Sequence, residues 1–156
     1  MDNSMFCFQC EQTAGSKGCT KVGVCSKDPD VAKMQDVLIY LCKGIGFYGT
    51  KVVEEGKEIP QEIGEFFTEC LFATLTNVNF STSRFVDFIK NANEVKQYFM
   101  DEVGDIAGVP DGADFIAPET MGEILNISSR VNLGVMDNDD LDMDIRSLRE
   151  FLIYGL

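Results

Sequence analysis

Residues 28–45, Asp-Pro-Asp-Val-Ala-Lys-Met-Gln-Asp-Val-Leu-Ile-Tyr-Leu-Cys-Lys-Gly-Ile, carry the clearest structural signal in the chain. Asp28 is a capping residue and Pro29 suits a first helical position, so a helix is predicted over about residues 29–55. Apolar side chains recur at steps of three and four, as on a helix with one buried face. They are Val31, Met34, Leu38, Leu41, Cys42 and Ile45. Three glycines in its second half are predicted to let another helix cross closely. They are Gly44, Gly46 and Gly49.

The following segments show the same helical period, and we predict an all-α fold. A second helix is predicted over residues 61–76. Its apolar face comprises Ile63, Phe66, Phe67, Cys70, Leu71 and Leu75. A third helix, capped by Ser81 or Ser83, is predicted to run to about Val103. Its buried side comprises Phe85, Phe88, Ile89, Val95, Tyr98 and Phe99. Three helices with short links form a bundle.

We divide the chain into four parts. Residues 1–28 form a cysteine-containing loop, residues 29–103 the first bundle, residues 104–117 a linker and residues 118–156 an incomplete second bundle. In the last part, a helix opening at Pro118-Glu119 and ending near Leu133-Gly134 precedes an acidic run, residues 137–144, and a final helix. We interpret the run as a solvated loop, because the spacing of a calcium-binding EF-hand is absent.

An internal repeat supports the incomplete second bundle. Residues 30–40 align without gaps on residues 144–154, with four identities, although two amphipathic helices can also match by chance. The second copy stops two residues after Tyr154 and would expose Phe151, Leu152 and Ile153. We expect this helix to pair in a homodimer or with a missing remainder of an enzyme. In the competing arrangement it folds back on the bundle and the chain is a monomer.

Composition excludes several functions. The 156 residues carry 13 basic and 26 acidic side chains, a net charge of −13, which disfavours nucleic acid and anionic membranes as partners. The absence of histidine excludes imidazole chemistry. Because no membrane span or signal peptide is evident, a cytoplasmic location is predicted.

Four cysteines form the candidate functional site. Cys7, Cys10, Cys19 and Cys25 follow a C-x2-C-x8-C-x5-C pattern within 19 residues, which is typical of ligands to one metal or cluster. Zinc ribbons usually contain two similar Cys-x-x-Cys pairs, so the spacing favours iron–sulfur over zinc. The alternative is a helical assembly protein with structural zinc or no metal. Two further cysteines, at core positions of their helices, are predicted to be inert buried thiols. They are Cys42 and Cys70.

The cysteines lie in a basic part of this acidic chain. Residues 12–27 contain Lys17, Lys21 and Lys27 and no carboxylate. Such charges lower thiol pKa values and offset the negative charge of a thiolate-ligated cluster. We predict either that these lysines attract an acidic electron donor by charge complementarity, or that they only change the reduction potential of the cluster.

The sequence from Met5 to Ala14, continued from Gly18 to Cys25, closely resembles the start of the hybrid cluster protein family, also called prismane or hydroxylamine reductase. The likeness extends through residues 35–44 and again through residues 144–150. The resemblance implies that Cys7, Cys10, Cys19 and Cys25 hold a proximal [4Fe-4S] cluster of the type found in anaerobes. From the basic residues beside these cysteines, we predict that a ferredoxin-like protein is the electron donor.

Members of that family are several times longer, and their later domains bind the hybrid cluster that reduces hydroxylamine through histidine, glutamate and cysteine. This chain has no histidine and only two spare cysteines. We therefore expect an electron-transfer module of an oxidoreductase that does not turn over substrate alone.

Overall fold

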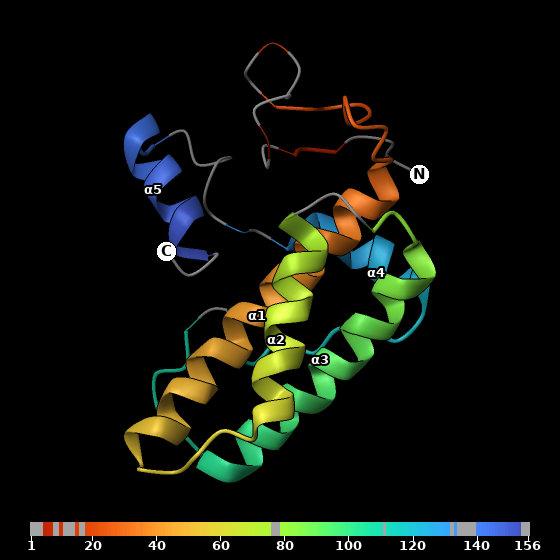
Figure 1. The fold of residues 1–156 in the computed structure, drawn as a ribbon. Coiled ribbons are helices and arrows are strands. Elements are labelled where there is room, and N and C mark those ends of the chain that lie inside the picture. Colours follow the sequence, from red (N-terminus) through yellow and green to blue (C-terminus); the bar gives the residue numbers. More distant parts are fainter. Residues whose placement is uncertain are drawn as a thin grey trace.

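The helices form one bundle with a separate C-terminal helix (Figure 1). The computed structural model describes residues 5–7, 10, 15, 18–75, 79–110, 112–131, 133 and 140–153. Its helices are α1 (Pro29–Glu54), α2 (Gln61–Leu75), α3 (Thr82–Val103), α4 (Met121–Ile127), the short 3-10 helix η2 (Ser128–Arg130) and α5 (Met143–Ile153). Within this part of the chain, strand pairing is confined to one isolated bridge between Cys7 and Cys19. The all-α prediction is confirmed.

Local capping explains where the long helices begin. The Asp28 carboxylate accepts a hydrogen bond from the Val31 N–H at 2.9 Å, and Pro29 occupies the first turn of α1. Ser81 caps α3 by accepting from the Arg84 N–H at 3.4 Å. The predicted starts of both helices are confirmed.

Helix α1 is the centre of the core. It makes its most extensive contact with α3 and a smaller one with α2, and the three helices lie side by side (Figure 1). The six apolar residues predicted for its buried face are each at most 3% exposed. Burial of such side chains contributes about 1.5 to 3 kcal/mol each, so this helix organises the bundle.

The faces of α2 and α3 differ in part from their predictions. On α3, Phe85, Phe88, Ile89 and Phe99 are buried as predicted, whereas Tyr98 is 40% exposed and the unpredicted Lys96 is completely buried. On α2, Cys70 is buried, but Leu75, at the end of the helix, is 43% exposed. Periodicity assigns a face but does not reveal how far a neighbouring helix covers it.

The irregular segment between α3 and α4 packs on the bundle. The Asn93 side chain donates to the Ala117 carbonyl at 2.8 Å and accepts from the Ala117 N–H at 3.1 Å. Ala113 is also buried, and its carbonyl would lie 3.0 Å from a Cβ added to Gly44. The prediction of a close approach is therefore confirmed at Gly44. Besides the irregular backbone, helix α3 also approaches here, because the Lys96 Cδ would lie 3.0 Å from the same added Cβ.

The other two glycines of α1 behave differently. A Cβ on Gly49 would meet Phe99 at an ordinary 3.4 Å, and one on Gly46 would meet nothing within 4 Å. The predicted close crossing is wrong at Gly46, because that position faces open space.

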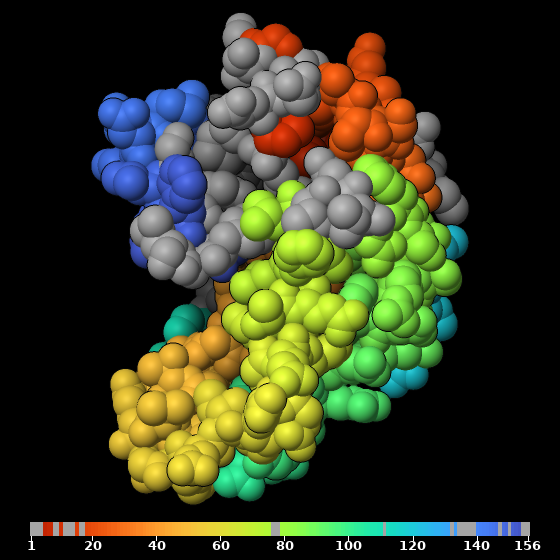
Figure 2. Space-filling view, viewed as in Figure 1, coloured from red at the N-terminus to blue at the C-terminus, as the bar shows by residue number. Residues whose placement is uncertain are grey.

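The C-terminal helices are shorter and less buried. Thr120 caps α4, which begins after the predicted start at Pro118 and continues into η2. Five apolar residues of α5 are exposed: Met143 52%, Ile145 47%, Leu148 59%, Phe151 61% and Leu152 65%. The predicted exposure is confirmed for Phe151 and Leu152, but Ile153 is half-buried. Figure 2 shows α5 at the side of the molecule. Tyr154 and residues 137–139 lie outside the described part of the chain.

The end of helix α5 approaches the bundle. Leu152 and Ile153 line a cavity of about 320 Å³ together with residues of α1 and α2. These are Ile39, Cys42, Lys43, Gly46, Phe67 and Leu71. Among the described helices, none is long and apolar enough to cross a membrane.

Lys96 is a buried cation where α3 contacts the irregular segment between α3 and α4. Its ammonium donates to the Phe115 carbonyl and lies 5.9 Å from the centre of the Phe115 ring. Burial lowers its pKa to about 8, and the charge of Asp114 acts in the opposite direction. The folded protein therefore releases this proton at a lower pH than the unfolded chain does.

We expect the Lys96→Met variant to reveal this effect between about pH 8 and 10.5. In that window the unfolded chain retains a proton that the native state has lost, so Lys96 makes the free energy of unfolding rise with pH. Urea unfolding at several pH values should show wild type gaining stability relative to the variant. The pKa of the Cys70 thiol is also raised in the folded protein, but this thiol is present in both proteins. Its contribution to the pH dependence of stability therefore cancels in the comparison. A difference that is constant with pH would contradict the prediction.

Candidate metal centre

The chain before α1 folds back on itself at Cys7 and Cys19. The Cys7 N–H donates to the Cys19 carbonyl at 3.0 Å, and the Cys19 N–H donates to the Cys7 carbonyl at 2.8 Å. Directly opposed residues of an antiparallel pair project their side chains from the same face. The structure thus brings together two of the four predicted ligands, which are twelve positions apart in the sequence.

A small apolar cluster attaches this paired segment to α1. Met5 and Cys19 are 7% and 4% exposed and pack with Ala32 in the first turns of the helix. A third backbone hydrogen bond, from the Met5 N–H to the Thr20 carbonyl at 3.3 Å, extends the pairing. The two opposed cysteines are therefore held beside the start of α1 (Figure 1).

A tight turn carries Cys25. The Gly23 N–H donates to the Lys27 carbonyl at 2.7 Å, and the Ser26 N–H donates to the Gly23 carbonyl at 2.8 Å. A Cβ added to Gly23 would lie 3.1 Å from the Cys25 sulfur and 3.0 Å from the Lys27 Cβ. Glycine is needed here because the sulfur approaches the backbone so closely. Cys25 itself is exposed.

Lys27 follows this turn and points into the protein. Its side chain is completely buried, and its Nζ lies 3.6 Å from the Cys7 sulfur. A buried ammonium cannot contact a second protein directly, so the prediction that Lys27 helps to receive an electron donor depends on charge attraction alone and stays a prediction. Lys21 is exposed, and Lys17 lies outside the described residues.

The four predicted ligands are not gathered as a complete set. In the described part of the chain, no three cysteine, aspartate or glutamate side chains lie close enough together to hold a metal ion. Cys10 is half-buried, and none of the six cysteines forms a disulfide. The donor chemistry still fits a thiolate-bound group, because reduced thiols, a buried cation and a glycine cradle occur together.

Comparison with known proteins shows the family of this chain. The family model for the Prismane/CO dehydrogenase family matches residues 5–156. The chain belongs to this family. It is 38% identical over 156 residues to a hydroxylamine reductase of Desulfovibrio desulfuricans, covering 100% of this chain and 28% of that protein.

Two further relatives give the same result. Hydroxylamine reductases of Thermosipho melanesiensis and Halothermothrix orenii are each 41% identical, over 162 and 160 residues. The alignments cover 97% and 98% of this chain and 28% of each relative. The chain thus spans just over a quarter of the length of the curated relatives it matches, and family membership relates it to oxidoreductases.

Cys42 and Cys70 form a separate buried pair between α1 and α2. They are 3% and 0% exposed, so their prediction as core thiols is confirmed. The hydrogen bond to Cys42 and the burial of the thiol together raise the pKa of Cys70. A thiol that stays protonated is a poor nucleophile and a poor metal ligand, so Cys70 is unsuited to metal binding.

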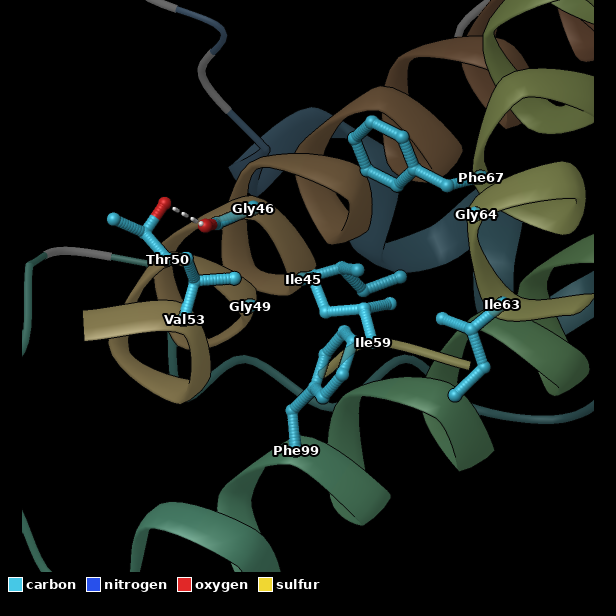
Figure 3. A pocket seen from close by; sticks show the side chains of 10 residues that line it. All are labelled: Ile45, Gly46, Gly49, Thr50, Val53, Ile59, Ile63, Gly64, Phe67 and Phe99. Atoms are coloured by element: carbon cyan, nitrogen blue, oxygen red, sulfur yellow. Dashed lines mark hydrogen bonds between the residues drawn. The ribbon is translucent and has the colours of Figure 1, made fainter. Parts of the chain in front are cut away.

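The cavity in Figure 3 offers no second reactive site. It measures about 320 Å³ and lies among α1, α2 and α3, with Ile45, Ile63 and Phe99 on its wall. The Thr50 hydroxyl on its rim donates to the Gly46 carbonyl at 2.8 Å. An apolar cavity without converging polar groups can hold an apolar molecule but does not position a reacting one.

We expect alkylation of the metal-free, reduced protein to separate the two groups of cysteines. Iodoacetamide should modify the exposed Cys25 roughly tenfold or more faster than Cys42 and Cys70, because labelling of a buried thiol waits for local opening. Peptide mass spectrometry after timed exposure measures these rates. Labelling in denaturant should remove the difference, whereas equal rates in the native protein would contradict the structure.

Proposed function

We propose that this chain is the cluster-binding, electron-entry portion of a hydroxylamine reductase-type oxidoreductase. Cys7, Cys10, Cys19 and Cys25 would ligate one [4Fe-4S] cluster. The observation that carries the proposal is the opposed pair Cys7 and Cys19 with the buried ammonium of Lys27 at the Cys7 sulfur. Thiolates beside a buried cation suit an anionic cluster better than they suit an apolar core.

Cluster binding would complete the site by drawing Cys10 and Cys25 toward the existing pair. Metal binding to a small loop is commonly coupled to its folding, because the free energy of ligation also orders the chain. The turn between Gly23 and Lys27 leaves Cys25 on the surface, where it can move at little cost. When bound, the cluster supplies one-electron transfer.

Hydroxylamine reduction by this chain alone is not part of the proposal. Substrate reduction requires a metal with an open coordination position, and the chain has no histidine and only Cys42 and Cys70 beyond the four ligands. The chain spans 28% of the hydroxylamine reductases that it matches. We assign the reacting site to the part of such enzymes that lies beyond this similarity.

Anaerobic reconstitution with iron and sulfide tests the proposal. We expect about four irons per chain, a broad visible absorption and an electron paramagnetic resonance signal after reduction. A Cys10→Ser variant should lose most of the iron, and Gly23→Ala should lose part of it, because the added methyl group would displace the Cys25 sulfur. Cys42→Ala is the matched control and should keep the cluster.

Stoichiometric zinc with no uptake of iron would overturn the proposal. That result would favour the alternative of a structural protein whose four cysteines bind zinc. Equal iron retention by Cys10→Ser and the wild type would exclude Cys10 as a ligand.

The electron donor is proposed to be an acidic protein of the ferredoxin or flavodoxin type. Lys21, Val22 and Val24 are exposed beside Cys25, which gives this surface a positive charge and two apolar contacts. The rest of the chain is strongly acidic, so this end is the least repulsive to an anionic donor.

We expect Lys21→Glu to slow reduction of the reconstituted protein by such a donor several-fold at low salt, with the difference fading as salt rises. Stopped-flow absorption measures the second-order rate. Lys51→Glu makes the same change of charge near the other end of α1 and should have little effect. A wild-type rate that does not depend on salt would contradict electrostatic steering.

The exposed face of α5 is proposed to mediate association, with a second copy in isolation or with the remainder of a larger enzyme. Sedimentation equilibrium should show a dimer at high micromolar concentration, and Phe151→Asp should shift the mass toward the 17.3 kDa monomer. Ile116→Asp places the same charge at another exposed apolar position and should leave the dimer intact. A wild-type protein that remains monomeric would contradict the proposal.

A further inference from the structure

Lys27 holds a buried ammonium beside the sulfur of a candidate metal ligand, Cys7. Its side chain is 0% exposed in a chain whose net charge is −13, so ample acidic surface was available for an exposed ion pair. Burying an ammonium group is costly unless strong acceptors surround it. The Cys7 sulfur lies 3.6 Å from Nζ. A neutral thiol is a weak acceptor, whereas a thiolate or a cluster-bound sulfur is a strong one.

The backbone fixes this lysine from both sides. Its carbonyl accepts from the Gly23 N–H at 2.7 Å, and Asp28, the next residue, caps α1. The Lys27 Cβ packs against Gly23, at 3.0 Å from the position of an added Cβ. Because the turn and the helix start are both hydrogen-bonded, the lysine stem is held in one direction, toward Cys7.

We propose that Lys27 is a positioning residue that keeps its ammonium at the Cys7 sulfur and thereby raises the reduction potential of the cluster. The inference rests on the proposed function of the four cysteines. Reduction adds one negative charge to the cluster, and a fixed neighbouring cation stabilises the reduced state more than the oxidised state. Lys21, which is exposed to water, has a screened charge and should contribute much less.

The test is a redox titration of the reconstituted Lys27→Met variant, followed by electron paramagnetic resonance. Methionine has a similar length without the charge, and thermal unfolding of the metal-free variant measures separately any effect of the substitution on folding. We expect the equilibrium constant for one-electron reduction to fall about tenfold or more, which is about 59 mV toward lower potential. Lys27→Arg should stay near the wild-type value. Lys21→Met is the matched control and should leave the potential unchanged, because donor docking does not enter an equilibrium titration.

The outcomes separate this inference from the proposed function. A wild-type protein that takes up no iron overturns the proposed function, and the inference with it. A Lys27→Met variant with a full cluster and the wild-type potential overturns the inference alone. If Lys27→Met melts like the wild type but takes up no cluster, iron uptake by Lys27→Arg supports the need for a cation. If Lys27→Arg also takes up no iron, the shape of lysine and not its charge is required, and this result overturns the inference.

Discussion

The packing of α1 against α3 is the constraint on which the other features depend. The buried face of α1 runs from Val31 to Val52, and its main partners on α3 are aromatic or aliphatic. Rotation of α1 about its axis would move these side chains into water at a cost of about 1.5 to 3 kcal/mol each. The helix therefore has one stable orientation, and its first turn, where the cysteine segment attaches, inherits that orientation.

The cysteine segment has little core of its own. Met5 and Cys19 pack on Ala32, and Cys7 is partly buried beside them. A segment that buries so little apolar surface gains stability from ligand binding more readily than from packing, which is the usual behaviour of small metal-binding loops. Three backbone hydrogen bonds set its register in advance, so Cys7 and Cys19 need not search for each other. Before a metal binds, backbone pairing thus already orders two of the candidate ligands, Cys7 and Cys19.

Among the residues that the structure describes, Lys27 and Lys96 are fully buried, and their surroundings differ in kind. Lys96 has a carbonyl oxygen and an aromatic ring near its ammonium, and burial lowers its pKa. Lys27 has the sulfur of a candidate metal ligand near its ammonium. The first arrangement joins the irregular segment after α3 to the bundle. The second lies between the start of α1 and the cysteine site, so the two buried cations occupy different contacts of the molecule.

The sequence by itself determined the helices and the composition of the candidate site. Three- and four-residue spacing of apolar side chains follows from helical geometry, and Asp28-Pro29 and Ser81 satisfy exposed N–H groups locally, so both could be predicted without a fold. The four cysteines could be proposed as ligands from their spacing alone, because thiols on one short loop can reach the same metal without the rest of the fold.

Only the tertiary structure decided which side chains these elements bury. Lys27 and Lys21 look alike in sequence, yet the turn at Gly23 directs one inward and leaves the other in water. Tyr98 and Lys96 exchange their expected environments because the segment around Phe115 covers one side of α3 and leaves the other open. The opposition of Cys7 and Cys19 likewise depends on backbone pairing between residues twelve positions apart. Burial and pairing of this kind arise from contacts between distant segments, which local spacing does not encode.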